Sequence, residues 1–387
     1  MICEKDKCTG CFACYNVCPK SAIQMNEDEF GFIYPEIDKS KCINCNLCKK
    51  ICPVINKLEL QEPLKCLAAR AKDEDVLKNS SSGGIATVIS KNVIENKGII
   101  YGSVFSDNCT INHTRIDKIE DLKKTQGSKY VHSYINNCYS LIKKDLENKH
   151  LVLFIGTPCQ VAGLKNYLRK DYELLYTIDL ICHGVPSQKF LKDEVNRINH
   201  SLDIDRVDFR DKKYKERNFS IKKDNNVIFN ENWKKSPYFF TFMNSYTLRD
   251  NCYSCSYSSI KRCSDMTIGD FWGIPEESKF YSSKEKGVSV LIPTTPKGLH
   301  LIELIEDNIE YEERNIEETI VENSHLRNPS EKSRKVDKFK KEYLKRNNFY
   351  KSYKKVFFTN YLKQELKKNK LVSNILKIKK GVKNGKK

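Results

Sequence analysis

A cysteine pattern that occurs twice near the N-terminus constrains the fold of this chain more than any other feature of its sequence. The first copy runs from Cys8 to Pro19 and the second from Cys42 to Pro53, so four cysteines and a proline recur 34 residues later. Each copy has the spacing C-x2-C-x2-C-x3-C-P, in which three close thiolates bind one iron–sulfur cluster and the fourth binds the other cluster. We therefore expect two 4Fe-4S clusters, one held by Cys8, Cys11, Cys14 and Cys52 and the other by Cys42, Cys45, Cys48 and Cys18.

A disulfide-stapled module or a pair of zinc sites could also account for eight cysteines in so short a segment. A structural zinc ion usually takes two cysteines from each of two separated knuckles, and it requires neither a third close cysteine nor a fourth that crosses over. The doubled, in-register spacing therefore favours clusters. The segment resembles the bacterial two-cluster ferredoxins, which have an α+β fold and carry single electrons at low potential. This resemblance implies that the rest of the chain uses electrons.

The length and hydropathy of the chain limit the kind of domain that can accompany this module. The 387 residues leave room for one large domain or two modest ones. Mean hydropathy is −0.59, and the longest apolar run, residues 151–155, is far shorter than the roughly 20 residues that span a bilayer. The first residues do not have the pattern of a secretion signal. Since 17 cysteines in such a chain indicate a reducing compartment, we expect a cytoplasmic protein.

The net charge of +18 comes almost entirely from the C-terminal segment. Residues 331–387 contain 21 Lys and Arg against 4 Asp and Glu, whereas the rest of the chain contains 47 against 46. Residues 363–387 could form a basic amphipathic helix on an anionic membrane surface, or they could be a solvated, partly disordered tail. No nucleic-acid-binding motif accompanies the charge, so we do not expect a nucleic-acid partner.

Between the two ends, helical and strand patterns alternate. Apolar strands are predicted at residues 66–71, 98–105, 151–155 and 173–181, and helices come after several of them. This alternation predicts an α/β core with a mixed, largely parallel sheet, whose ligand lies at the carboxyl ends of the strands. We thus expect a ferredoxin-type domain over residues 1–57, the α/β core over 58–330, and a basic helical or disordered tail over 331–387.

A run of small polar residues precedes one of the predicted helices. The residues are Ser81, Ser82, Gly83 and Gly84, and an apolar helical pattern begins directly after them. Such a helix start presents free backbone N–H groups to an anion, and we expect a phosphate or cofactor contact there, although helix capping explains one or two serines equally well. The sequence contains neither G-x-G-x-x-G nor a P-loop, so it does not support a Rossmann-type or ATP-driven site.

Six motifs occur in the order found in one protein family. They are residues 81–84, 127–131, 156–163, 182–187, the pair Cys252 and Cys255, and residues 268–273. In these motifs the chain resembles the coenzyme F420 hydrogenase/dehydrogenase beta subunit family, in the version fused to an N-terminal ferredoxin. The resemblance implies FAD, a further 4Fe-4S cluster and a two-electron carrier such as F420. The implied cofactor-binding residues are Ser81, Ser82, Gly83, Gly84, Gly127, Ser128, Lys129, Tyr130 and Thr157.

Two functions are the leading hypotheses. The first is an iron–sulfur flavoprotein oxidoreductase that passes electrons between the clusters and a small organic substrate, with F420 as a candidate. Because clusters move one electron at a time and most organic substrates take two, a flavin is the expected converter. The second is a non-catalytic subunit that relays electrons to a partner enzyme, for example alongside cell-surface polysaccharide synthesis. An electron-carrier protein or an F420-like carrier is the expected partner in either case.

Four further cysteines are candidates for a third cluster. Cys159 and Cys182 come after neighbouring predicted strands, and Cys252 and Cys255 form a two-residue-spaced pair, so all four can converge where the flavin is expected. The family resemblance places ligands in the same motifs. Cys263 is a substitute for one of the four, and the alternative is that these are four unrelated buried thiols.

Two polar side chains in the motifs are candidates for direct roles in the chemistry. His183 could donate a proton near the flavin, or it could simply hydrogen-bond a sulfur atom beside Cys182. Lys129 could neutralise a reduced flavin or a substrate anion. The remaining cysteines lack partner spacing and are expected to be ordinary buried thiols: Cys3, Cys66, Cys109 and Cys138.

Overall fold

The N-terminal module is built around its two cysteine runs. The computed structural model describes residues 2–214 and 217–368. In the module, a β1–β2 hairpin is antiparallel and pairs Ile23 with Ile37. Each cysteine run turns through a residue with positive φ, Phe12 (63°) in the first copy and Asn46 (57°) in the second, immediately before a short helix. The elements are η1 (Lys5–Lys7), α1 (Ala13–Val17), β1 (Ile23–Glu27), β2 (Ile33–Ile37) and α2 (Leu47–Lys50).

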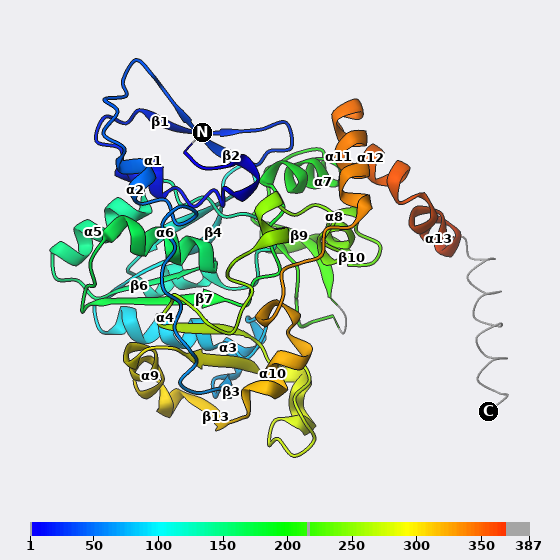
Figure 1. Cartoon of the computed structure of the whole chain (residues 1–387). Helices are drawn as coiled ribbons and strands as arrows, with labels where there is room; N and C mark the ends of the chain where they lie inside the picture. Colours follow the sequence, from blue (N-terminus) through cyan, green and yellow to red (C-terminus); the bar gives the residue numbers. More distant parts are fainter. Residues whose placement is uncertain (1, 215–216, 369–387) are drawn as a thin grey trace.

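An eight-stranded mixed sheet forms the centre of the molecule, in the order β13-β3-β12-β11-β7-β6-β4-β5 (Figure 1). The four central strands β4, β6, β7 and β11 are parallel to one another, and the flanking pairs are antiparallel. The predicted α/β core with a mixed sheet is therefore confirmed. The strands are β3 (Leu67–Ala71), β4 (Ile99–Ser106), β5 (Thr110–Ile116), β6 (Val152–Gly156), β7 (Leu175–Leu180), β11 (Met266–Asp270), β12 (Ser289–Pro293) and β13 (Ile309–Glu313).

Helices cover both faces of this sheet (Figure 1). One face packs against α4 and α9, and the other against α5, α6 and the ferredoxin module. Apolar side chains alternate between the faces, for example Ile100 toward α4 and Tyr101 toward α5. The helices of this part are α3 (Glu74–Lys78), α4 (Ile85–Glu95), η2 (Ile119–Thr125), α5 (Cys138–Glu147), α6 (Pro158–Leu168), η3 (Asp250–Ser254), η4 (Tyr281–Lys286), α9 (Pro296–Glu303), η5 (Glu306–Asn308), α10 (Ile316–Glu322) and η6 (Ser324–Leu326).

A second core, rich in aromatic side chains, lies beside the sheet. It joins a three-stranded antiparallel sheet, in the order β10-β9-β8, to helices from distant parts of the chain. The elements are α7 (Gln188–Asn199), β8 (Arg206–Asp208), β9 (Asn218–Lys223), β10 (Asn226–Asn232), α8 (Pro237–Met243), α11 (Arg334–Arg346), α12 (Phe349–Val356) and α13 (Phe358–Lys368).

The first part of the basic segment belongs to this aromatic core. Val336, Phe339 and Tyr343 on α11 and Phe349 and Tyr353 on α12 are at most 1% exposed. The N-terminal part of the predicted basic tail is therefore helical, and its apolar residues, which recur at helical spacing among the lysines, face the core. The predicted tail helix begins within α13, and its residues 369–387 lie outside the described residues. The predicted domain boundaries stay predictions.

The helices of the molecule are short or carry many charged side chains. Within residues 2–214 and 217–368, no helix is both long enough and apolar enough to cross a bilayer.

Candidate functional site

The first set of predicted ligands lies inside the ferredoxin module. Cys8, Cys11 and Cys52 are buried, and together with Cys14 they line a small apolar cavity. Burial raises the pKa of Cys11 to about 12, and it also raises the pKa of Cys14. A thiol buried in apolar surroundings resists ionisation unless a cation or a metal compensates its charge. The four thiols that spacing assigned to one cluster thus lie around one cavity.

Cys3 also lines this cavity, which the sequence did not indicate. The neighbouring thiols of Cys52 and Cys8 raise its pKa. Cys3 is predicted to be an ordinary buried thiol, but it is half-buried and lies between two predicted ligands. Cys66, Cys109 and Cys138 are buried within the hydrophobic cores, as expected of ordinary buried thiols.

The second set lies at the molecular surface. Cys45 is exposed, and Cys18, Cys42 and Cys48 are half-buried. Cys48 lies within electrostatic range of Cys45 and Cys18, although burial is the main cause that raises its pKa. Cys18 from the first copy therefore lies with the cysteines of the second copy, and Cys52 lies with those of the first. This exchange is the arrangement that the spacing predicts.

A third set of four cysteines meets in the α/β core. Cys159 lies in the first turn of α6, Cys182 comes after β7, and Cys252 and Cys255 lie in and directly after η3. Burial is the main cause that raises the pKa of Cys159, and Cys255, Cys182 and Cys252 raise it further. Each of the other three thiols is thus close enough to influence its charge. The structure brings together the four cysteines that the sequence proposed.

Cys263 occupies a different position. Its Sγ lies 3.7 Å from the carbonyl oxygen of Pro158, and the charged neighbours that affect its pKa are Asp179, Lys165 and Arg262. It therefore lies behind the first turn of α6 rather than among the four thiols. Within the described residues, no three Cys, His, Asp or Glu side chains are close enough to hold a single metal ion. A cubane carries its thiolates at separate corners, so its ligands lie further apart than those of one ion.

The first set and the core set are separated by α6. A Cβ atom added at Gly163 would lie 3.0 Å from the Cβ and Sγ of Cys11 and 3.0 Å from the hydroxyl of Tyr139. The backbone of α6 can approach Cys11 this closely because residue 163 has no side chain. Since Cys159 lies one turn earlier on the same helix, the two sets are neighbours across α6. The spacing of the ligands does not predict this contact. The only signal for it in the sequence is a glycine within an apolar helical pattern.

Two buried arginines flank these thiols. Arg249 is 0% exposed, donates from Nε to the Cys8 carbonyl (2.7 Å) and from Nη2 to the Ile33 carbonyl (2.8 Å), and leaves Nη1 without a partner among the described residues. Arg262 donates from Nη1 to the Tyr257 carbonyl (2.9 Å), and its Nε and Nη2 have no described partner. Neither forms an ion pair within the described chain. Because a buried charge without a counter-charge is costly, the Arg249 site fits an anionic cluster nearby. Arg262 also interacts electrostatically with the buried carboxyl group of Asp179.

A cavity of about 500 Å³ opens at the carboxyl ends of the parallel strands. Gly156 at the end of β6, Leu180 at the end of β7 and Asp270 at the end of β11 line it. Cys182 of the core set lines it as well, so the third thiol set and the cavity share a wall. Its volume is in the range of small-molecule and cofactor sites, and its position is the one expected in open α/β sheets.

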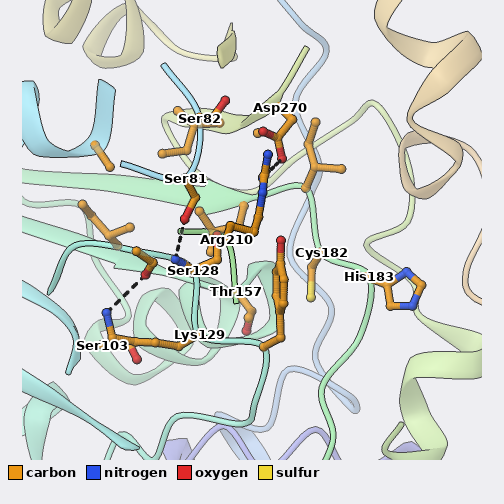
Figure 2. A pocket seen from close by; sticks show the side chains of 18 of the residues that line it. Ser81, Ser82, Ser103, Ser128, Lys129, Thr157, Cys182, His183, Arg210 and Asp270 are labelled. Carbon is orange, nitrogen blue, oxygen red and sulfur yellow. Dashed lines mark hydrogen bonds and ion pairs between the residues drawn. The ribbon is translucent and has the colours of Figure 1, made fainter. Parts of the chain in front are cut away.

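Of the predicted loop residues 81–84, Ser81, Ser82 and Gly84 line this cavity, and Figure 2 shows Ser81 and Ser82 on one side of it. Ser81 Oγ accepts a hydrogen bond from the backbone N–H of Ser128 at 2.8 Å, which joins the two predicted cofactor loops. Gly84 is the N-cap of α4 with φ of 81°, and no side chain caps this helix. The first N–H groups of α4 are therefore free of a side-chain cap at the point where Ser81, Ser82 and Gly84 line the cavity.

Gly83, Thr157 and Tyr130 have structural partners of their own. A Cβ atom at Gly83 would lie 2.5 Å from the carbonyl oxygen of Ala69, so this glycine permits a close packing of the loop on the sheet. Thr157 lines the cavity at the start of α6, and its hydroxyl donates to Gln160 Oε1 (3.1 Å) and lies 3.2 Å from Cys159 Sγ. Tyr130 stacks on Phe242 with ring centroids 4.8 Å apart. These residues shape the cavity wall and anchor the loops around it.

Lys129 lies on the loop after Gly127, whose φ is 80°. Its Nζ donates to the carbonyl oxygens of Thr125 (2.9 Å) and Gln126 (3.1 Å). Burial lowers the pKa of Lys129 to about 7. The charge of this cavity-lining amine therefore changes near neutral pH and would be favoured by a bound anion.

Arg210 and Arg217 bring fixed positive charge to the cavity. Arg210 forms an ion pair with Asp270, which a dashed line marks in Figure 2. Its guanidinium lies 5.2 Å from the ring centroid of Trp272. Although burial opposes its charge, Tyr130 and Asp270 raise the pKa of Arg210. Arg217 lies 4.7 Å from the same ring, which is 36% exposed. A half-exposed indole with two guanidinium groups can bind a planar anion.

His183 lies outside the cavity centre. Figure 2 shows its ring on the far side of Cys182. Its Nε2 lies 3.0 Å from the Phe242 carbonyl oxygen and 3.1 Å from Ser245 Oγ, and burial lowers its pKa to about 4. The imidazole is thus neutral at pH 7 and is held by Phe242 and Ser245, which suits a role in positioning the Cys182 loop.

Comparison with known proteins extends these observations. Two adjacent parts of the chain match the two models of the family described as coenzyme F420 hydrogenase/dehydrogenase, beta subunit. Residues 66–139 match the N-terminal model of this family, and residues 149–319 match its C-terminal model. Residues 7–56 match the 4Fe-4S dicluster domain.

An uncharacterized protein of Methanocaldococcus jannaschii is 27% identical over 206 residues, which are 44% of this chain and 56% of that protein. The match thus spans little more than half the length of this relative. A chain of the F420-reducing NiFe hydrogenase complex from Methanosarcina barkeri, solved with xenon, is 20% identical with a TM-score of 0.47, and the match covers 74% of this chain and 93% of that chain.

Proposed function

Because the chain belongs to the coenzyme F420 hydrogenase/dehydrogenase beta subunit family and carries a 4Fe-4S dicluster domain, we propose that it is a flavin-dependent oxidoreductase. The predicted family is confirmed, and the chain is an iron–sulfur electron-transfer protein of that family. Beyond this, the proposed reaction moves electrons between its 4Fe-4S clusters and an organic substrate that accepts or donates two electrons. FAD in the cavity is the proposed cofactor.

The observation that carries the proposal is the continuity from the ferredoxin module to the cavity. Cys11 lies against Gly163 of α6, Cys159 lies in the first turn of that helix, and Cys182 lines the cavity. The first thiol set is therefore next to the core set, and the core set is next to a cavity of cofactor size. A protein that only stored clusters would not require this adjacency.

The cavity residues fit a cofactor that carries phosphate groups. The free N–H groups at the start of α4 and the hydroxyls of Ser81 and Ser82 suit a phosphate, and Lys129 adds a cation whose charge an anion would favour. We assign the loop at Gly127, Ser128 and Lys129 to the same ligand. A flavin bound there supplies the exchange between single electrons and hydride that side chains cannot perform.

We propose that Lys129 neutralises the negative charge of the reduced cofactor or of the substrate. We propose that His183 positions Cys182. For the substrate we propose a planar anion such as F420, held at the cavity mouth by Trp272 and Arg217. Asp270 fixes Arg210 in the same wall.

The third cluster is part of the proposal, with Cys159, Cys182, Cys252 and Cys255 as ligands. Anaerobically reconstituted protein should then contain about twelve iron atoms, and a Cys159→Ala, Cys255→Ala variant about eight. Cys263→Ala is the matched control, because this buried thiol lies near α6 but outside the set, and it should keep about twelve. A wild-type protein that saturates near eight iron atoms contradicts the third cluster.

The experiment that tests the function is anaerobic purification with visible spectroscopy and flavin extraction. We expect about one FAD per chain and bleaching of its absorption when a reduced two-electron carrier such as F420 is added. Clusters that are reducible in a protein without flavin would overturn the proposal and favour a relay subunit.

A further inference from the structure

We propose that the surface around Cys42, Cys45 and Cys48 is the docking site for an acidic electron-carrier protein. The inference rests on the iron–sulfur electron-transfer function but does not depend on FAD or on the third cluster.

The second thiol set is the accessible one of the two in the ferredoxin module. Cys45 is exposed, whereas Cys8, Cys11 and Cys52 of the first set are buried. The first set faces the α/β core through Gly163, so the second set is the one left to exchange electrons with another molecule.

The surface also has the composition of a protein interface. Ile43, between Cys42 and Cys45, is 57% exposed, and Ile55, three residues after Cys52, is 49% exposed. Both are large apolar side chains on an otherwise polar surface, and Asn44 and Asn46 lie exposed beside them. An apolar centre surrounded by polar and charged residues is the usual anatomy of a protein–protein contact.

The charge of the surface identifies the class of partner. Residues 39–57 contain five lysines and no Asp or Glu. Lys39, Lys49, Lys50 and Lys57 are exposed and form no ion pair within the described residues, while Lys41 pairs with Asp38 at 3.3 Å. The chain apart from residues 331–387 is nearly neutral, so this is a local concentration of charge. It fits an acidic partner, which the lysines would attract and orient before contact.

The proposed step transfers one electron from the reduced carrier to an oxidised cluster of this chain, or the reverse. No bond is formed or broken, and no proton is required. The partner must therefore be a one-electron carrier with an acidic surface, and an acidic two-cluster ferredoxin is a suitable probe.

The test uses the full chain with its clusters. Binding of the oxidised probe ferredoxin is measured by anaerobic isothermal titration calorimetry, and electron transfer by stopped-flow absorbance of the clusters. The variant Lys49→Glu, Lys50→Glu should weaken binding about tenfold and slow transfer from the ferredoxin, because changes in rim charge act on association. Reduction by dithionite should be unchanged. Binding of the wild type should also weaken from low salt to about 0.15 M ionic strength.

The matched control is Lys338→Glu, Lys341→Glu on α11, which makes the same change in net charge at exposed positions. Figure 1 shows α11 well apart from α2. This control should retain wild-type binding. Equal weakening by both variants would mean non-specific attraction, and unchanged binding by the Lys49, Lys50 variant would mean docking elsewhere; either result overturns the proposal. Both readouts are independent of flavin, so a failure of the proposed oxidoreductase function would be seen separately.

Discussion

Replacing Arg249 with glutamine is expected to lower the reduction potential of the cluster held by Cys8, Cys11, Cys14 and Cys52. Arg249 is fully buried, bonds the Cys8 carbonyl oxygen at 2.7 Å, and has no described carboxylate partner. Reduction adds a negative charge to the cluster. A fixed positive charge beside it stabilises the reduced state more than the oxidised state, so its loss makes reduction harder.

The magnitude depends on the distance and the surroundings. At an effective dielectric constant of about 20, two unit charges about 8 Å apart interact with roughly 2 kcal/mol. Because about 1.4 kcal/mol corresponds to a tenfold change in an equilibrium constant, or about 59 mV for one electron, the expected decrease is about 90 mV. The guanidinium is buried, so salt should change this shift little.

The assay is an anaerobic redox titration of the reconstituted protein monitored by electron paramagnetic resonance. Arg249→Lys is the matched variant, because it keeps the positive charge but lacks the planar guanidinium that donates hydrogen bonds to both carbonyl oxygens. We expect a large decrease in potential for Arg249→Gln and a small one for Arg249→Lys. Equal shifts in the two variants would show that geometry and not charge sets the potential, which would refute the reasoning.

Three further predictions concern the cavity, the aromatic core and α6. Since burial lowers the pKa of Lys129 to about 7, a rise in pH through this value removes the charge of the amine. The affinity for FAD, measured by fluorescence titration, should therefore fall as the pH rises from about 6 to 8. A Lys129→Gln variant should lose this pH dependence. Phe339→Ala should reduce the free energy of unfolding, measured by anaerobic chemical denaturation, by about 3–5 kcal/mol, whereas Leu344→Ala, at a 56% exposed position of the same helix, should change it by less than about 0.5 kcal/mol. Gly163→Ala places a methyl group 3.0 Å from Cys11 Sγ. This substitution should lower the free energy of unfolding by about 1–3 kcal/mol and reduce the iron that the protein retains during gel filtration. Full iron retention at wild-type stability would contradict the close contact.

Features that depend on local spacing could be predicted from the sequence. The two cysteine runs predict their ligand sets, because the spacing of a few neighbouring cysteines determines which of them can reach the same cluster. The alternation of helices and strands likewise predicted the parallel strands β4, β6 and β7 and the edge of the sheet where the cavity lies.

Features that depend on tertiary packing could not be predicted in this way. Cys3 reaches the first thiol set only because the chain folds back, and no spacing rule marks it. Arg249 and Arg262 are ordinary charged residues in the sequence, and only the structure shows that both are buried with N–H groups that have no described hydrogen-bond partner. On α11, the lysine count concealed an apolar face of Val336, Phe339 and Tyr343, because net charge does not report helical spacing.

The packing of the ferredoxin module against α6 has a consequence for how electrons travel. Phe12 and Ile33 of the module share one apolar core with α5 and α6, and Arg249 joins Cys8 to the rest of the chain. A carrier domain on a flexible tether would have to leave its docking place and return with each electron, so its turnover would depend on diffusion and on solvent viscosity. Here the module is packed against the core, so it does not have to move when it exchanges an electron.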